Sequence, residues 1–145
     1  MNERAQGILL AVAVTLSASA CGGMTIRPPT PVRAVVISSF QVLYGPEIPG
    51  DRQGLLNRSQ VPAKMAAALR AAYPLGQGPQ VRVLITQFRA GRWGPTRMHA
   101  VVQVLGPGGQ VLHQFEVDST SVHGNRGRKI QAVSQDIVNQ IAQQL

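Results

Sequence analysis

Hydrophobic positions along the chain fall into four strand-like runs and two helix-like runs. Runs rich in β-branched and aliphatic residues, bounded by Gly, Pro and polar clusters, predict strands. These runs cover residues 32–42, 81–89, 98–105 and 111–122. In the first run Val35, Val36 and Ile37 are consecutive, and this predicts a strand that is buried on both faces.

Two segments carry apolar residues at helical spacing. The first begins near Ser59, which can cap a helix, has Pro62 in its first turn and ends before Pro74. The second is a terminal helix, and its apolar face would comprise Ile130, Val133, Ile137, Ile141 and Leu145. Residues 44–58 are rich in Gly and Pro, so we expect a loop there.

The order of these elements predicts the fold class. Gly106-Pro107-Gly108-Gly109 favours a tight hairpin between the last two strands, because glycine supplies positive φ angles. The first two strands should be parallel through a right-handed crossover, and the later strands antiparallel. We therefore expect an α/β (α+β) fold with a four-stranded mixed sheet, in the order β-α-β-β-β-α, and two helices on one face.

The first 20 residues have the pattern of an export segment. Arg4 provides the positive end, and the apolar stretch from Ile8 to Leu16 is too short to span a bilayer. The segment ends in Ala-Ser-Ala before Cys21, the only cysteine, and this ending resembles the bacterial lipobox, with Ala18 where that motif usually has Leu. The resemblance implies cleavage before Cys21 and lipid on its sulfur. The alternative is an ordinary secretory signal, cut before Cys21 to leave a free thiol.

The chain is therefore expected to have three parts: a lipoprotein signal peptide (1–20), a lipidated cysteine with a Pro-rich tether (21–31), and one periplasmic α/β domain (32–145). The prolines favour an extended tether with a reach of roughly 3 Å per residue, which would let the domain stand away from the membrane. Gly22 after the cysteine implies, by resemblance to enterobacterial sorting, the periplasmic face of the outer membrane.

The charge balance restricts the possible partners. The chain has 14 basic and 6 acidic residues and a net charge of +8, and only Lys64 and Lys129 are lysines. In the periplasm the available polyanions are lipid phosphates, lipopolysaccharide, peptidoglycan and acidic proteins, and we expect no nucleic acid partner. With Cys21 lipidated, the domain has no thiol for a disulfide, a zinc site or a cysteine nucleophile.

The run from Met98 to Leu145 contains a hairpin, then GGQVLHQFEVDSTSVHG, then a helix ending in DIVNQIAQQL. This run looks like small bacterial envelope lipoproteins whose fold is similar to the TolB amino-terminal domain and the CsgG periplasmic α/β unit. It also resembles PqiC-type auxiliary lipoproteins of lipid transport. The resemblance implies an accessory or assembly role, and it transfers no functional residue to this chain.

The sequence contains no pattern that indicates catalysis, and we expect no catalytic residue, no metal and no cofactor. His99, His113 and His123 lack the spacing of metal ligands. Glu116 and Asp118 would share one face of a strand, where solubility explains them better than paired-carboxylate chemistry. Nucleophile-elbow and phosphate-loop motifs are both missing.

The most suggestive segment is the Arg–Trp loop, residues 89–97. It places Arg89, Arg92 and Arg97 around Trp93, the only tryptophan. Arg and Trp are enriched in binding hot spots, so these four residues are candidates for partner contact. The alternative is that Trp93 folds back as a lid on the edge of the core.

A second candidate is the basic helix start, which comprises Arg126, Arg128 and Lys129. Positive charges there oppose the helix dipole, and free helix N–H groups beside arginines could bind an anion. The alternative is a frayed, solvated first turn.

We expect an outer-membrane lipoprotein that serves as an accessory or assembly subunit of an envelope transport or secretion system. The second hypothesis is a binder of anionic envelope ligands such as lipid phosphates, lipopolysaccharide or peptidoglycan. A hydrolase is a distant third. The expected partners are the membrane, reached through the anchor, and an envelope protein complex.

Lipidation of Cys21 gives the first testable prediction. Replacing the sulfur by an oxygen removes the nucleophile that accepts diacylglycerol, so Cys21→Ser should abolish fatty-acid labelling and detergent-phase partitioning. Labelling of the variant at the level of the parent would contradict the lipobox assignment.

Overall fold

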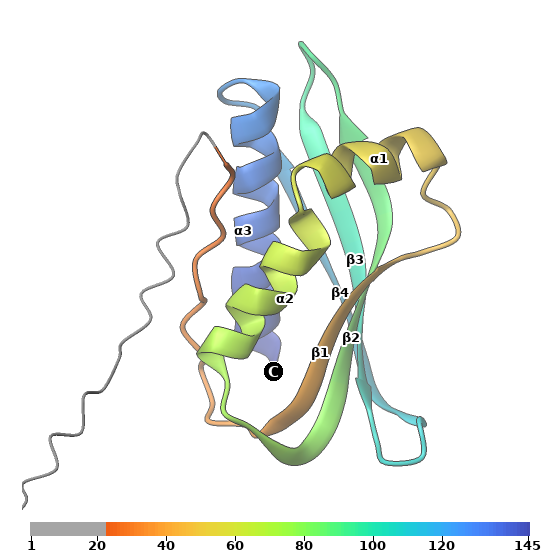
Figure 1. Cartoon of the computed structure of the whole chain (residues 1–145), viewed down its shortest axis with the longest axis vertical. Helices are drawn as coiled ribbons and strands as arrows, with labels where there is room; N and C mark the ends of the chain where they lie inside the picture. The colour runs from red at the N-terminus through yellow and green to blue at the C-terminus, as the bar shows by residue number, and fades with distance from the viewer. Residues whose placement is uncertain (1–22) are drawn as a thin grey trace, which may run out of the picture.

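The four predicted strands form one mixed sheet in the computed structural model, which describes residues 23–145 (Figure 1). The strands are β1 (Ile37–Tyr44), β2 (Leu75–Ala90), β3 (Thr96–Leu105) and β4 (Val111–Ser121), and they lie in the spatial order β1-β2-β3-β4. The β1–β2 pair is parallel and the other two pairs are antiparallel. The predicted fold class is confirmed, and Cys21 lies outside the described residues.

Helices α2 (Val61–Ala72) and α3 (Arg126–Gln144) pack against one face of this sheet (Figure 1). The facing side chains belong to cross-strand rows such as Val42, Val83, Val102 and Phe115. Ile137 of α3 and Leu69 of α2 are fully buried against them. The core therefore consists of one sheet face and the apolar stripes of two helices.

Residues 44–58 differ from the predicted loop, because they contain helix α1 (Gly50–Arg58). Only Leu56 of this helix is buried, so the segment lacks the apolar period that reveals a helix in a sequence. The Tyr44 hydroxyl donates to Asn57 Oδ1 over 2.6 Å, and its partial burial raises the pKa of the Tyr44 phenol. Gln60, at φ 54°, separates α1 from α2.

The first strand also differs from its prediction. It begins at Ile37 rather than residue 32, and Val36 is 43% exposed, so burial on both faces of this strand is wrong. The β2 strand begins at Leu75, six positions before the predicted start at residue 81, because its first residues pair with β1. A Cβ atom at Gly78 would lie 2.1 Å from the Val36 carbonyl oxygen, so only glycine fits at this close approach.

The part of the tether that the structure describes lies against the helices and does not extend away from them. Ile26 and Pro29 are buried. Arg27 N donates to Gln135 Oε1 over 2.7 Å, and Gln135 Nε2 donates back to the Arg27 carbonyl over 3.0 Å. The free reach expected from the prolines is therefore lost from Gly23 onward.

Burial of α3 gives the second prediction. Ile137→Asp places an unpaired carboxylate in the core, and it should lower the free energy of unfolding by roughly 4 kcal/mol or more. Gln131→Asp, on the exposed face of the same helix, is the matched control and should change it by less than about 0.5 kcal/mol. Urea denaturation measures both, and equal midpoints for Ile137→Asp and the parent would contradict the placement of the helix.

Candidate functional site

The Arg–Trp loop forms the tip between β2 and β3. Arg89 and Arg97 are directly opposite each other in the antiparallel register, and their side chains are exposed. Gly91, Gly94 and Pro95 let the chain reverse between the two strands. Trp93 is 93% exposed, so the alternative in which it covers the core edge is wrong.

Lys129 connects this loop to the terminal helix. Its side chain is only 3% exposed, and Nζ donates to the Gly94 carbonyl over 2.7 Å. The structure thus places Lys129 differently from the prediction, because its ammonium group is directed to the loop backbone and away from a solvent-borne anion. The bond holds the Arg–Trp loop against the start of α3.

The first turn of α3 is capped. Asn125 Oδ1 accepts a hydrogen bond from Arg128 N over 2.9 Å, which satisfies one of the free N–H groups of the helix. The alternative of a frayed start is therefore wrong. The side chains of Arg126 and Arg128 are exposed beyond this cap.

The two candidate segments come together at one end of the molecule, although 35 positions separate Gly94 from Lys129. Their exposed members define what we call the basic end. It comprises Arg89, Arg92, Trp93, Arg97, Arg126 and Arg128. Six of the positions that the sequence singled out for binding thus lie at this end of the molecule, and the buried Lys129 links the two segments.

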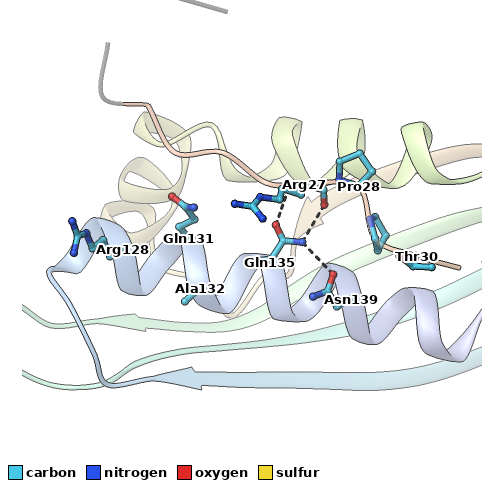
Figure 2. Close-up of a pocket in the computed structure, with 9 residues that line it drawn as sticks. Arg27, Pro28, Thr30, Arg128, Gln131, Ala132, Gln135 and Asn139 are labelled. Carbon is cyan, nitrogen blue, oxygen red and sulfur yellow. Dashed lines mark hydrogen bonds between the residues drawn. The ribbon is translucent and has the colours of Figure 1, made fainter. Parts of the chain in front are cut away.

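Beside the basic end, an open groove of about 610 Å³ runs between the tether and α3. Figure 2 shows Gln135 facing Arg27 across this groove and Arg128 at the amino-terminal end of the helix. Gln135 Nε2 also donates to Asn139 Oδ1 over 3.1 Å, which orients the amide that holds the tether. Sequence reasoning missed this contact, because nothing in a Pro-rich segment indicates where it docks.

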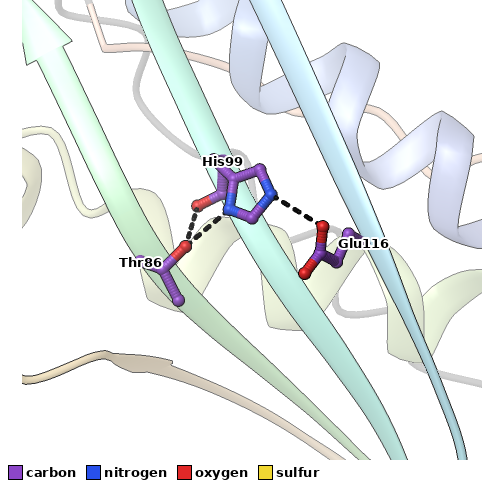
Figure 3. A network of polar contacts seen from close by, with 3 residues as sticks. All are labelled: Thr86, His99 and Glu116. Atoms are coloured by element: carbon purple, nitrogen blue, oxygen red, sulfur yellow. Dashed lines mark hydrogen bonds and ion pairs between the residues drawn. The ribbon is translucent and has the colours of Figure 1, made fainter.

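A polar trio on the other face of the sheet was also missed (Figure 3). Thr86 Oγ1 lies 2.6 Å from His99 Nδ1, and His99 Nε2 lies 3.5 Å from Glu116 Oε2. The hydroxyl–imidazole–carboxylate order is that of a nucleophile, a base and an orienting acid. The cross-strand register could have suggested it, since Glu116 lies two residues from Asp118, the residue opposite His99, and so shares its face of the strand.

Among residues 23–145, no cluster of three or more His, Cys, Asp or Glu side chains could hold a metal ion. None of the helices in this range combines the length and hydropathy needed to cross a membrane. Among these residues Glu116 forms an ion pair with His99, over 3.5 Å.

No protein-family model matches this sequence, and no curated protein matches it significantly. Similar solved structures include the PelC dodecamer from Paraburkholderia phytofirmans, at 10% identity and TM-score 0.45, covering 77% of this chain and 92% of that one. A DUF330 protein from Xanthomonas campestris has 12% identity and TM-score 0.48, covering 83% and 91%. A provisionally named lipoprotein from Caulobacter crescentus CB15 has 15% identity and TM-score 0.26, covering 72% and 80%.

All three TM-scores are below 0.5, so these similarities assign no function to this chain. The resemblance to the TolB, CsgG and PqiC-type units stays a prediction.

The contrast between Lys129 and Trp93 gives the third prediction. Lys129→Met keeps the length of the buried side chain but leaves the Gly94 carbonyl without its donor, so the free energy of unfolding should fall by about 1–3 kcal/mol. Trp93→Ala removes an exposed side chain and should change it by less than about 0.5 kcal/mol. Urea denaturation and hydrogen exchange of the loop amides measure both changes in the free energy of unfolding. If Trp93→Ala lowers it more than Lys129→Met does, a buried Lys129 beside an exposed Trp93 is contradicted.

Proposed function

We propose that this protein is an outer-membrane lipoprotein whose periplasmic domain catalyses no reaction and binds a partner protein. It would act as an accessory or assembly subunit of an envelope transport or secretion system. Lipid on Cys21 would keep it at the membrane. The proposal is carried by the uncovered face of the sheet.

This face presents apolar side chains to solvent. The cross-strand row Leu43, Leu84, Val101 and Glu116 lies on it, and no described helix packs against it (Figure 1). Leu43 is 44% exposed, and Leu112, near the hairpin end of β4, is 59% exposed. Leu43, Leu84 and Val101 are contiguous across three strands, and such an apolar row on an uncovered face supports a protein-binding surface.

The edges of the sheet support the same function. In the described chain β1 pairs only with β2, and β4 pairs only with β3. Each edge strand therefore keeps a row of backbone N–H and C=O groups that another strand could pair with. A partner could use such an edge by β-strand addition and contact the apolar row beside it.

The trio of Thr86, His99 and Glu116 does not favour a hydrolase. It lies on the open sheet face, whereas the groove beside Arg27 lies on the helix side. The Glu116 side chain is 67% exposed, so water screens its effect on the imidazole. The Thr86 hydroxyl also bonds the His99 carbonyl at 3.3 Å, which fits a strand-to-strand link.

The second candidate function is a binder of anionic envelope ligands. It is favoured by the five exposed arginines of the basic end. Arginine presents a planar fork of donors that suits phosphate and carboxylate groups. Such binding would weaken steeply with salt, whereas binding through the apolar row would not.

Site-specific photocrosslinking in the native envelope tests the protein partner and gives the fourth prediction. A photoreactive residue at Leu43 or Leu112 should form a discrete crosslinked product, because both positions are exposed on the proposed surface. The same residue at Gln143, exposed on α3, is the matched control and should form none. Products from the control alone would contradict the proposed surface.

A further inference from the structure

The start of the described chain is attached to the domain at several points. The Lys64 ammonium donates to the Met24 carbonyl, Ile26 is 9% exposed, and Gln135 holds Arg27 by two hydrogen bonds. Farther along, Val32 N reaches the Ala142 carbonyl over 3.5 Å. The segment therefore runs alongside α3 and parallel to it, with the same amino-to-carboxyl direction.

Only Gly22 separates the proposed lipid attachment site, Cys21, from the described residues. Two residues of fully extended chain span at most about 7 Å. A domain attached from Gly23 onward therefore lies close to the bilayer, with the end that carries Gly23 nearest to the lipid. The tether limits the orientation of the domain as well as its distance.

Gly23 lies beside the amino-terminal part of α3. The segment is level with Gln135 at Arg27 and with Ala142 at Val32, so going back from Arg27 to Gly23 it approaches the start of the helix. Figure 2 shows the described start of the segment on the side of Arg128 and Gln131. The lipid anchor and the basic end are therefore on the same side of the domain.

We propose that the basic end is a membrane-docking surface that rests on anionic phospholipid headgroups, with Trp93 inserted at the interface. This inference rests on the Cys21 anchor of the proposed function and assigns a ligand to the second candidate surface. Arg92, Arg126 and Arg128 would bond lipid phosphates, each contributing about 1 kcal/mol near an anionic surface.

Trp93 supplies the second element of this surface. A 93% exposed indole on the tip of a hairpin is unusual in water and is suited to the membrane–water boundary, where Trp is enriched. The bond from Lys129 to Gly94 keeps the loop in place, so little conformational entropy is lost on docking.

The charge around this surface stays positive. Helix α1, nearer this end of the sheet than the other (Figure 1), carries Asp51 together with Arg52 and Arg58, and Glu47 precedes it. The charges of these two acids and two arginines cancel, so the arginines of the basic end make the net charge of this end positive. Asp118 and Glu116 lie on the uncovered sheet face.

Trp93 is the only tryptophan, so its fluorescence reports this surface directly. The processed, lipidated protein is reconstituted into phosphatidylglycerol vesicles and into phosphatidylcholine vesicles. In the anionic vesicles we expect a blue-shifted emission, quenching by lipids brominated near the headgroup and protection from aqueous acrylamide. In the neutral vesicles we expect emission close to that of a water-exposed indole.

Paired variants test the arginines. The double variant Arg126→Ser and Arg128→Ser should lower the docked-to-undocked ratio by roughly 25-fold at low salt, since two contacts of about 1 kcal/mol are lost. Arg33→Ser is the matched control, because Arg33 is exposed beside Val32, at the opposite end of α3. Circular dichroism checks that each variant keeps its fold.

Failure of the docking surface can be distinguished from failure of the lipid anchor. Fatty-acid labelling of Cys21 with a fully water-exposed Trp93 in anionic vesicles would overturn the docking surface and leave the lipoprotein assignment standing. Absence of labelling would remove the anchor and both proposals. A Trp93 that is shielded in native envelopes but not in vesicles would overturn the membrane surface in favour of a protein contact.

Discussion

The apolar faces of α2 and α3 cover only one side of the four-stranded sheet, and this one-sided burial determines which surfaces remain free. Valine and isoleucine rows on the inner face supply the core with the two helices. The opposite face keeps the alternate residues of each strand and stays in solvent. A sheet with helices on only one face has a second face and two edge strands that can contact other molecules.

Contacts along α3 give the domain two different ends. At the amino-terminal end of the helix, the Asn125 cap and the Lys129 ammonium position the exposed arginines and Trp93. At the other end, Leu75 and Val111 are more than half exposed. Five exposed arginines and the exposed indole thus lie at one end, and the exposed side chains of Leu75 and Val111 lie at the other.

Because the tether is docked on the domain, the difference between the two ends would affect which end faces the bilayer. A freely extended tether would let the domain rotate, so no end would be preferred at the bilayer. The two hydrogen bonds between Arg27 and Gln135 and the burial of Ile26 remove most of that freedom. Orientation at the membrane would then follow from packing and would need no further partner.

Local sequence determined the strand and helix identities, the hairpin and the apolar face of α3, because each depends on residue spacing or on glycine geometry. Helix α1 escaped sequence reasoning, since one buried leucine gives no period, and the length of β2 depended on its partner strand. The Arg–Trp loop and the basic helix start were recognisable separately. Only the tertiary structure joined them, because the Lys129–Gly94 bond and the docking of Arg27 on Gln135 are contacts between residues far apart in the chain.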